Sequence, residues 1–149
     1  MVSLHSFTFN PYQENTYILA DPSGECVIID PGCYGNQEQQ QLRSHIETHN
    51  LKVVALINTH GHIDHMLGNA YVKRTFQVPF VAHEGIAKEL EYVSPWASMM
   101  GLQVEPSPLP DETISEGSEV TFGTTKLKVF DTPGHSPAHI SLYCETEKL

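Results

Sequence analysis

Four side chains of the kinds that bind metal ions lie within six positions near the middle of the chain. The stretch from Thr59 to His65 reads Thr-His-Gly-His-Ile-Asp-His, and residues 52–57 just before it form an apolar run of strand length. A stretch of helical character follows, from about Asp64 to Thr75. The cluster is therefore predicted on a loop that leaves a strand and enters a helix, a position where rigid elements hold functional groups.

The spacing of these four residues predicts how they divide between metal ions. His60 and His62 are two positions apart, so in extended backbone their side chains point to the same side. Asp64 and His65 are neighbours that diverge, which disfavours a shared tetrahedral site. The pattern indicates two metal ions about 3.5–4 Å apart. The alternative is a polar loop that is His-rich by chance, because the chain has 9 His in 149 residues.

A second motif stands near the C-terminal end of the chain and follows another strand-like run. Residues 131–136 read Asp-Thr-Pro-Gly-His-Ser. The His-x-His-x-Asp-His stretch and this Thr-Pro-Gly-His turn together resemble the signature of the metallo-β-lactamase fold superfamily, as do residues 15–19 and 28–32. Within that superfamily the chain looks most similar to small glyoxalase II-like hydrolases, which are related to hydroxyacylglutathione hydrolase.

This resemblance implies the α+β fold class and, within it, the αββα sandwich of the superfamily. Residues 1–149 would form one metallo-β-lactamase-like domain that lacks its C-terminal part, so that about the N-terminal two-thirds is present. The alternative is a natural short form. In a fragment, strands and helices would expose apolar faces that normally lie buried, which predicts self-association.

The resemblance also implies a set of metal ligands. His60, His62 and His135 would hold a first ion and leave a fourth position open. Asp64 and His65 would supply two ligands of a second ion, and Asp64 would also assist catalysis by accepting a hydrogen bond from the attacking hydroxide. The bridging Asp and the last His of the family would lie beyond this chain. The expected cofactor is zinc, one or two ions, with iron or manganese as alternatives.

The activity implied by the resemblance is hydrolysis of a small-molecule thioester or ester, such as S-lactoylglutathione. Zinc lowers the pKa of bound water to about 7, so no Ser or Cys nucleophile is required. One alternative is an iron-dependent persulfide dioxygenase, which looks similar around the three histidines, and a lactonase or β-lactamase is another. A third is a truncated, non-catalytic metal-binding fragment.

Charge and composition limit the classes of binding partner and the location that the sequence is compatible with. The net charge of −10 disfavours nucleic-acid binding, which needs a basic surface. No apolar run approaches the ~20 residues that a membrane span requires, and no signal segment opens the chain. Three cysteines without a close pair do not predict a disulfide framework. A cytoplasmic protein is expected.

Other polar residues near these motifs have two interpretations each. Asp30, at a strand end, either accepts hydrogen bonds beside the metal loop, as the resemblance implies, or caps a turn. His45 and His49 are four apart on a helix, and a solvated face is favoured over a metal pair. His83 is interpreted as a helix-start residue rather than a ligand. Cys33 as a nucleophile is disfavoured because no base lies next to it in the sequence.

Two further assignments concern residues that could contact a substrate or ligand. Trp96, Met99 and Met100 could line an apolar substrate mouth, but core packing is favoured. Ser136 or a backbone amide near His135 could orient a ligand.

Apolar periodicity and turn residues predict the remaining elements. The first half of the chain is expected to form three antiparallel strands at 1–9, 17–20 and 26–29, a helix at 36–49, a central buried strand at 53–57 and a helix at 64–75. A strand at 78–81 and a helix that opens at His83 and Glu84 follow, and the inner stripe of this helix is Ile86, Ala87 and Leu90. The remaining elements are a Pro-rich connection at 106–110, a hairpin at 120–130 and a last strand at 139–144.

Overall fold

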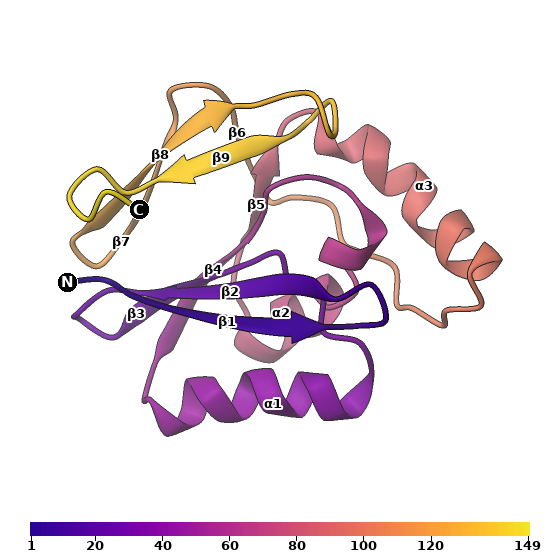
Figure 1. Ribbon diagram of the computed structural model, residues 1–149, viewed down its shortest axis with the longest axis horizontal. Coiled ribbons are helices and arrows are strands. Elements are labelled where there is room, and N and C mark those ends of the chain that lie inside the picture. Colours follow the sequence, from indigo (N-terminus) through magenta and orange to yellow (C-terminus); the bar gives the residue numbers. More distant parts are fainter.

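The computed structural model describes residues 1–149 and arranges nine strands in two sheets. The larger sheet has the order β1-β2-β3-β4-β5-β6, and the smaller has the order β7-β8-β9. Figure 1 shows α1 below the large sheet, the small sheet above it and α3 at one end. The elements are β1 (Ser3–Phe9), β2 (Glu14–Ala20), β3 (Glu25–Ile29), α1 (Gly35–Thr48), β4 (Lys52–Asn58), the 3-10 turn η1 (Ile63–His65), α2 (Asn69–Phe76), β5 (Phe80–His83), α3 (Ile86–Met99), β6 (Glu112–Ile114), β7 (Glu119–Phe122), β8 (Thr125–Asp131) and β9 (Ile140–Tyr143).

Two apolar clusters lie on opposite faces of the large sheet. Because side chains alternate along a strand, Leu56 of β4 joins the cluster shared with α1 and α2, whereas Ile57 joins the cluster shared with the small sheet. β4 is thus buried on both faces, which confirms the predicted central strand. The cluster on the helix side includes Leu42, Ile46, Val72 and Phe80, and the cluster between the sheets includes Val27, Phe122, Leu127, Val129 and Ile140.

The direction of the strands decides where a site can form. β1, β2 and β3 pair antiparallel, as predicted. From β3 to β6 the pairing is parallel, and α1, α2 and α3 each lie in one connection. The carboxyl ends of β3 and β4 therefore lie at the same edge of the sheet, and ligands of such sheets bind outside that edge. Asp30 follows β3 there, and the loop that begins at Thr59 follows β4.

The small sheet confirms the predicted hairpin and final strand. Leu127 and Val129 of β8 are buried against the large sheet, while Lys126 points outward. Phe130 and Tyr143 are 41% and 36% exposed on the outer face of this sheet, which no helix covers within residues 1–149. Self-association through exposed apolar faces stays a prediction.

The helix predicted at residues 64–75 is wrong in its first turn. Residues 63–65 form the 3-10 turn η1, and α2 begins only at Asn69. The amide of Gly68 bonds to the carbonyl of Pro31 over 2.7 Å, and a Cβ at Gly68 would lie 2.4 Å from Cys33 Sγ. Close packing against the end of β3 thus overrides the helical periodicity.

The elements around β5 also differ from expectation. His83 does not open a helix but ends β5, where it pairs with Ile114 of β6, a strand that the sequence did not predict. α3 starts at Ile86, and its buried residues are Ile86, Val93 and Ala97, so Ala87 is exposed rather than part of the inner stripe. A three-residue edge strand such as β6 is too short to show a periodic pattern.

The mixture of two sheets and three helices is an α+β fold. The longest helices have 14 residues, and none combines the length and apolar character that crossing a membrane requires.

Candidate metal centre

Three histidines from two different sheets meet at one edge of the molecule. His60 and His62 lie on the loop after β4, and His135 lies on the connection between β8 and β9. One ring nitrogen of each lies within 4.8 Å of the other two, close to the spacing of nitrogen ligands around one ion. The backbone of His62 is extended, and its ring lies 4.6 Å from that of His60, centroid to centroid, as the spacing predicted.

Hydrogen bonds hold the His60 ring in the tautomer that a metal ligand needs. The Thr59 hydroxyl donates to Asp30 Oδ2 over 2.6 Å, so its oxygen must accept from the His60 Nδ1–H at 2.9 Å. The lone pair then lies on Nε2, which is buried and has no hydrogen-bond partner. A buried polar atom of this kind is costly unless a ligand satisfies it, and a metal ion fits the donor set.

Asp30 organises the metal loop from the end of β3. Its carboxylate accepts the amide of Thr59 over 2.7 Å and Nδ2 of Asn58 over 3.2 Å. Its backbone has a φ of +50°, which is uncommon for a residue with a side chain and occurs at functional sites. Of the two interpretations of Asp30, the structure supports an acceptor beside the metal loop.

The environment favours the neutral rings that bind metals. Burial, followed by the nearby His65, lowers the pKa of His60 to about 4. Burial and the neighbouring His135 also lower the pKa of His62. Neutral imidazole is the form that coordinates an ion, so these shifts favour ligand binding at neutral pH.

A second group of potential ligands shares His60. Atoms of Asp30, His60 and His65 lie within 4.8 Å of one another. Nδ1 of His65 lies 3.3 Å from Asp30 Oδ2. Burial opposes protonation of His65, but the nearby carboxylates of Asp30 and Asp64 outweigh it and raise its pKa.

Asp64 belongs to neither group. Its carboxylate lies 3.5 Å from Nε2 of His65 and lines the groove next to His62. The assignments of Asp64 and His65 to a second ion, and of Asp64 to catalysis, stay predictions.

Glu14 is a buried carboxyl that sequence reasoning missed. It lies at the start of β2, only 4% exposed, and Oε1 is 3.8 Å from Nδ1 of His65 and has no hydrogen-bond partner. Burial raises its pKa to about 9, although the hydrogen bond from Thr16 opposes this. Gly32 leaves the space for it, because a Cβ there would lie 2.0 Å from Glu14 Oε2. Surrounded by turn residues, Glu14 carries no sequence signal.

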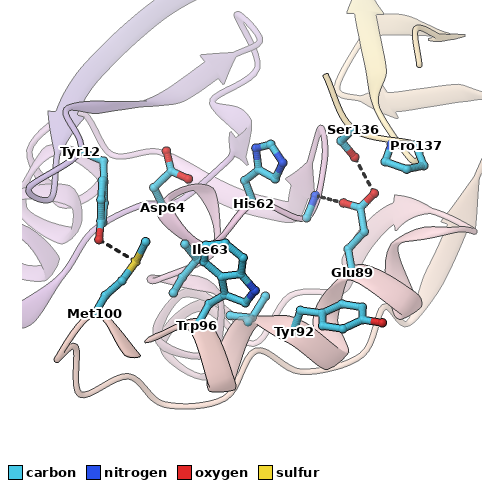
Figure 2. Close-up of a pocket in the computed structure, with 12 residues that line it drawn as sticks. Tyr12, His62, Ile63, Asp64, Glu89, Tyr92, Trp96, Met100, Ser136 and Pro137 are labelled. Atoms are coloured by element: carbon cyan, nitrogen blue, oxygen red, sulfur yellow. Dashed lines mark hydrogen bonds between the residues drawn. The ribbon is translucent and has the colours of Figure 1, made fainter. Parts of the chain in front are cut away.

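Glu89 of α3 connects the two histidine-bearing loops, and sequence reasoning missed it too. Its Oε2 accepts the amide of Gly61, between His60 and His62, over 2.7 Å. Its Oε1 accepts the Ser136 hydroxyl and, over 3.1 Å, the Ala138 amide, next to His135. In sequence it resembles any polar residue of a surface helix. Figure 2 shows the bond between Glu89 and Ser136, which is buried and oriented toward Glu89.

The favoured core role of Trp96, Met99 and Met100 is wrong. They are 53%, 82% and 42% exposed, and Trp96 and Met100 line a groove beside His62 and Asp64. Only one face of α3 packs on the core, through Val93 and Ala97 among others, so the remaining face is left toward solvent.

The other candidates lie outside the three-histidine cluster. The ring of His45 is partly buried and stacks between His5 and His49, with centroids 4.0 and 4.1 Å away, so this face is not simply solvated. His83 accepts the Gly85 amide through Nδ1 over 3.0 Å. Cys33 is buried, and burial raises its pKa to about 12, which disfavours a thiolate nucleophile.

Comparison with known proteins identifies the family. The model of the Metallo-beta-lactamase superfamily matches residues 9–149, nearly the whole chain. The chain therefore belongs to the metallo-β-lactamase superfamily, whose members bind divalent metals, and the three-histidine cluster lies within the matched region.

Relatives and solved structures agree with this assignment. The hydroxyacylglutathione hydrolase GloC of Haemophilus influenzae is 31% identical over 92% of the chain, which covers 63% of GloC. The BLEG-1 B3 metallo-beta-lactamase matches with a TM-score of 0.82 and 28% identity over 97% of the chain and 68% of that structure. TTHA1623 in a di-iron-bound form matches with a TM-score of 0.81 and 31% identity over 96% of the chain and 68% of that structure. The chain spans 63–64% of the length of the first curated relatives that it matches.

Proposed function

We propose that this chain supplies the metal-binding part of a hydrolase that cleaves thioesters in the manner of glyoxalase II. The observation that carries the proposal is the cluster of His60, His62 and His135, with a buried, unpartnered Nε2 on His60. The similarity to a hydroxyacylglutathione hydrolase supports a thioester substrate. Zinc and iron are both compatible with three imidazoles, and the di-iron form of TTHA1623 supports considering iron.

Some residues of the chain would hold the metal ion, and others would orient the attacking water. When bound, a divalent ion would lower the pKa of a coordinated water to about 7 and polarise the scissile carbonyl. His60, His62 and His135 would hold it as neutral rings. Asp64, which lines the groove beside His62, can accept a hydrogen bond from the attacking water. Neither a serine nor a cysteine nucleophile is needed.

The test measures metal content and thioester cleavage together in the full-length protein. The expected result is bound zinc or iron and thiol release from S-lactoylglutathione, both lost in His135→Ala. The control is His49→Ala, an exposed histidine outside the cluster, which should leave both unchanged. A metal-loaded protein that cleaves no thioester would refute the proposal.

A β-lactamase is the second candidate, because BLEG-1 shares the fold at 28% identity. Cleavage of a chromogenic cephalosporin by the same preparation, without thiol release from thioesters, would favour it. Oxygen consumption with a persulfide substrate and iron would instead indicate a dioxygenase.

A further inference from the structure

An apolar groove opens directly beside the metal centre. It has a volume of about 460 Å³, within the range of small-molecule sites. His62 and Asp64 lie on its wall, and α3 contributes Glu89, Tyr92, Val93 and Trp96 to the lining. Figure 2 shows both Trp96 and Ile63 in this lining.

Large apolar side chains are exposed around this groove. Tyr12, Tyr92, Trp96 and Met100 are 44%, 63%, 53% and 42% exposed. The Tyr12 hydroxyl lies 2.8 Å from Met100 Sδ, so the turn between β1 and β2 meets the end of α3. A cluster of solvent-exposed apolar side chains at a concave site indicates a ligand that covers them.

The charges of the groove limit what that ligand can be. No Lys or Arg lines it, and its acidic residues are Asp64 and Glu89. Both oxygens of Glu89 already accept hydrogen bonds from the histidine-bearing loops. Within this chain, an anionic group such as a carboxylate of glutathione would find no cation here, whereas an apolar group would cover the aromatic side chains.

We propose that the groove binds an apolar group, an aromatic ring or an alkyl chain of several carbons, that is attached to the scissile carbonyl of the substrate. Trp96 is the residue that determines this preference. The inference rests on the proposed ester or thioester hydrolysis and narrows its substrate class. The group is attached on either the acyl or the leaving-group side of the carbonyl, and the experiment separates the two.

The first experiment measures kcat/KM of the metal-loaded, full-length protein on p-nitrophenyl esters from acetyl to octanoyl. A matched series of acetate thioesters with lengthening alkyl thiols tests the leaving-group side. In one series kcat/KM should rise by up to about fourfold per added methylene, because burying a methylene is worth about 0.8 kcal/mol.

Two variants assign this length dependence to the groove. Trp96→Ala should lower kcat/KM on the longest substrate by about tenfold or more and change it little on the shortest, because only the longer chain reaches the indole. Met99→Ala is the matched control, since Met99 lies on the same helix, is 82% exposed and does not line the groove. A flat length profile in both series, or equal length dependence in Trp96→Ala, would overturn the inference.

The second experiment measures binding without catalysis. Trp96 is the single tryptophan of these 149 residues, so its fluorescence reports on the groove. Octan-1-ol should shift the emission of the metal-loaded protein saturably, butan-1-ol much more weakly, and Trp96→Phe should abolish the signal. No saturable response would overturn the groove assignment. A response without hydrolysis of any ester would overturn the proposed function instead.

Discussion

At the scale of single residues, a chain of hydrogen bonds fixes the tautomer of His60. The Thr59 hydroxyl donates its one proton to the carboxylate of Asp30, so its oxygen accepts from His60. This order places the His60 lone pair on the buried Nε2. Replacement of Thr59 or Asp30 would therefore disturb the tautomer of His60 while leaving all three histidines in the chain.

Glu89 offers the sharpest prediction at this scale. Glu89→Ala removes the acceptor that joins the amide of Gly61 to the loop of His135. Because hydrogen bonds behind metal ligands keep them in place, we expect about 10–100-fold weaker metal binding with an unchanged circular dichroism spectrum. Competition against a chromophoric chelator measures the affinity.

Two further variants make this prediction specific. Glu91→Ala, an exposed residue of the same helix, should bind metal like the wild type. Glu89→Gln keeps the shape and one acceptor oxygen, so its affinity should lie between those of the wild type and Glu89→Ala. Equal affinities for Glu89→Ala and Glu91→Ala would show that Glu89 does not position the ligands.

At the scale of elements, β4 and its loop carry the site. β4 is fixed between β3 and β5 and buried on both faces, so its carboxyl end is rigid. The segment after it forms a 3-10 turn rather than a helix, because Gly68 packs against Pro31 and Cys33. This turn sets where Asp64 and His65 lie relative to His60.

The stability of β4 can be tested in its core-facing residue. Leu56→Ala removes a fully buried side chain between the large sheet and its helices and should destabilise the protein by about 2–5 kcal/mol. Val54→Ala, at a partly buried position of the same strand, should destabilise the protein clearly less than Leu56→Ala. Urea unfolding at constant metal concentration measures the free energy of unfolding of both variants. Equal losses of this free energy would contradict the two-cluster core.

At the scale of the whole molecule, the metal centre exists only while the two sheets stay together. Asp21, after β2, links them at the end of the strands opposite the histidine cluster. Its carboxylate accepts the Thr124 amide over 3.1 Å and the Thr125 hydroxyl over 2.6 Å, at the turn into β8. The hydrogen bond from Thr125, followed by the amide of Ser23, holds the pKa of Asp21 well below its usual 3.8.

The pH dependence of stability follows from this shift. A carboxyl group whose pKa is lower in the folded state stabilises above its unfolded pKa, and this stabilisation is lost as the pH falls through the folded pKa. Asp21→Asn should therefore lower the melting temperature at pH 7, and the difference from wild type should shrink as the pH falls below 3.8.

Melting curves between pH 2 and 7, followed by circular dichroism, check this expectation. Glu84→Gln is the matched control, because Glu84 is exposed and its side chain accepts no hydrogen bond. A difference between Asp21→Asn and wild type that stays constant across this range would contradict the role of the ionised carboxylate.

The sequence by itself determined the elements with strong local patterns. The antiparallel start, the central strand β4, the β7–β8 hairpin and the two histidine motifs all follow from residues close together in the chain. The approach of His60 to His135 was foreseen only from family resemblance, since no local pattern relates positions so far apart.

Tertiary structure alone decided the rest. The late start of α2 at Asn69, the exposure of Trp96 and the roles of Glu14 and Glu89 depended on packing partners distant in sequence. The periodicity of apolar residues does not predict which face of α3 packs against the core. The hydrogen bonds of Glu89 join loops of both sheets beside the three histidines, and the separation of these loops is set only when both sheets have formed.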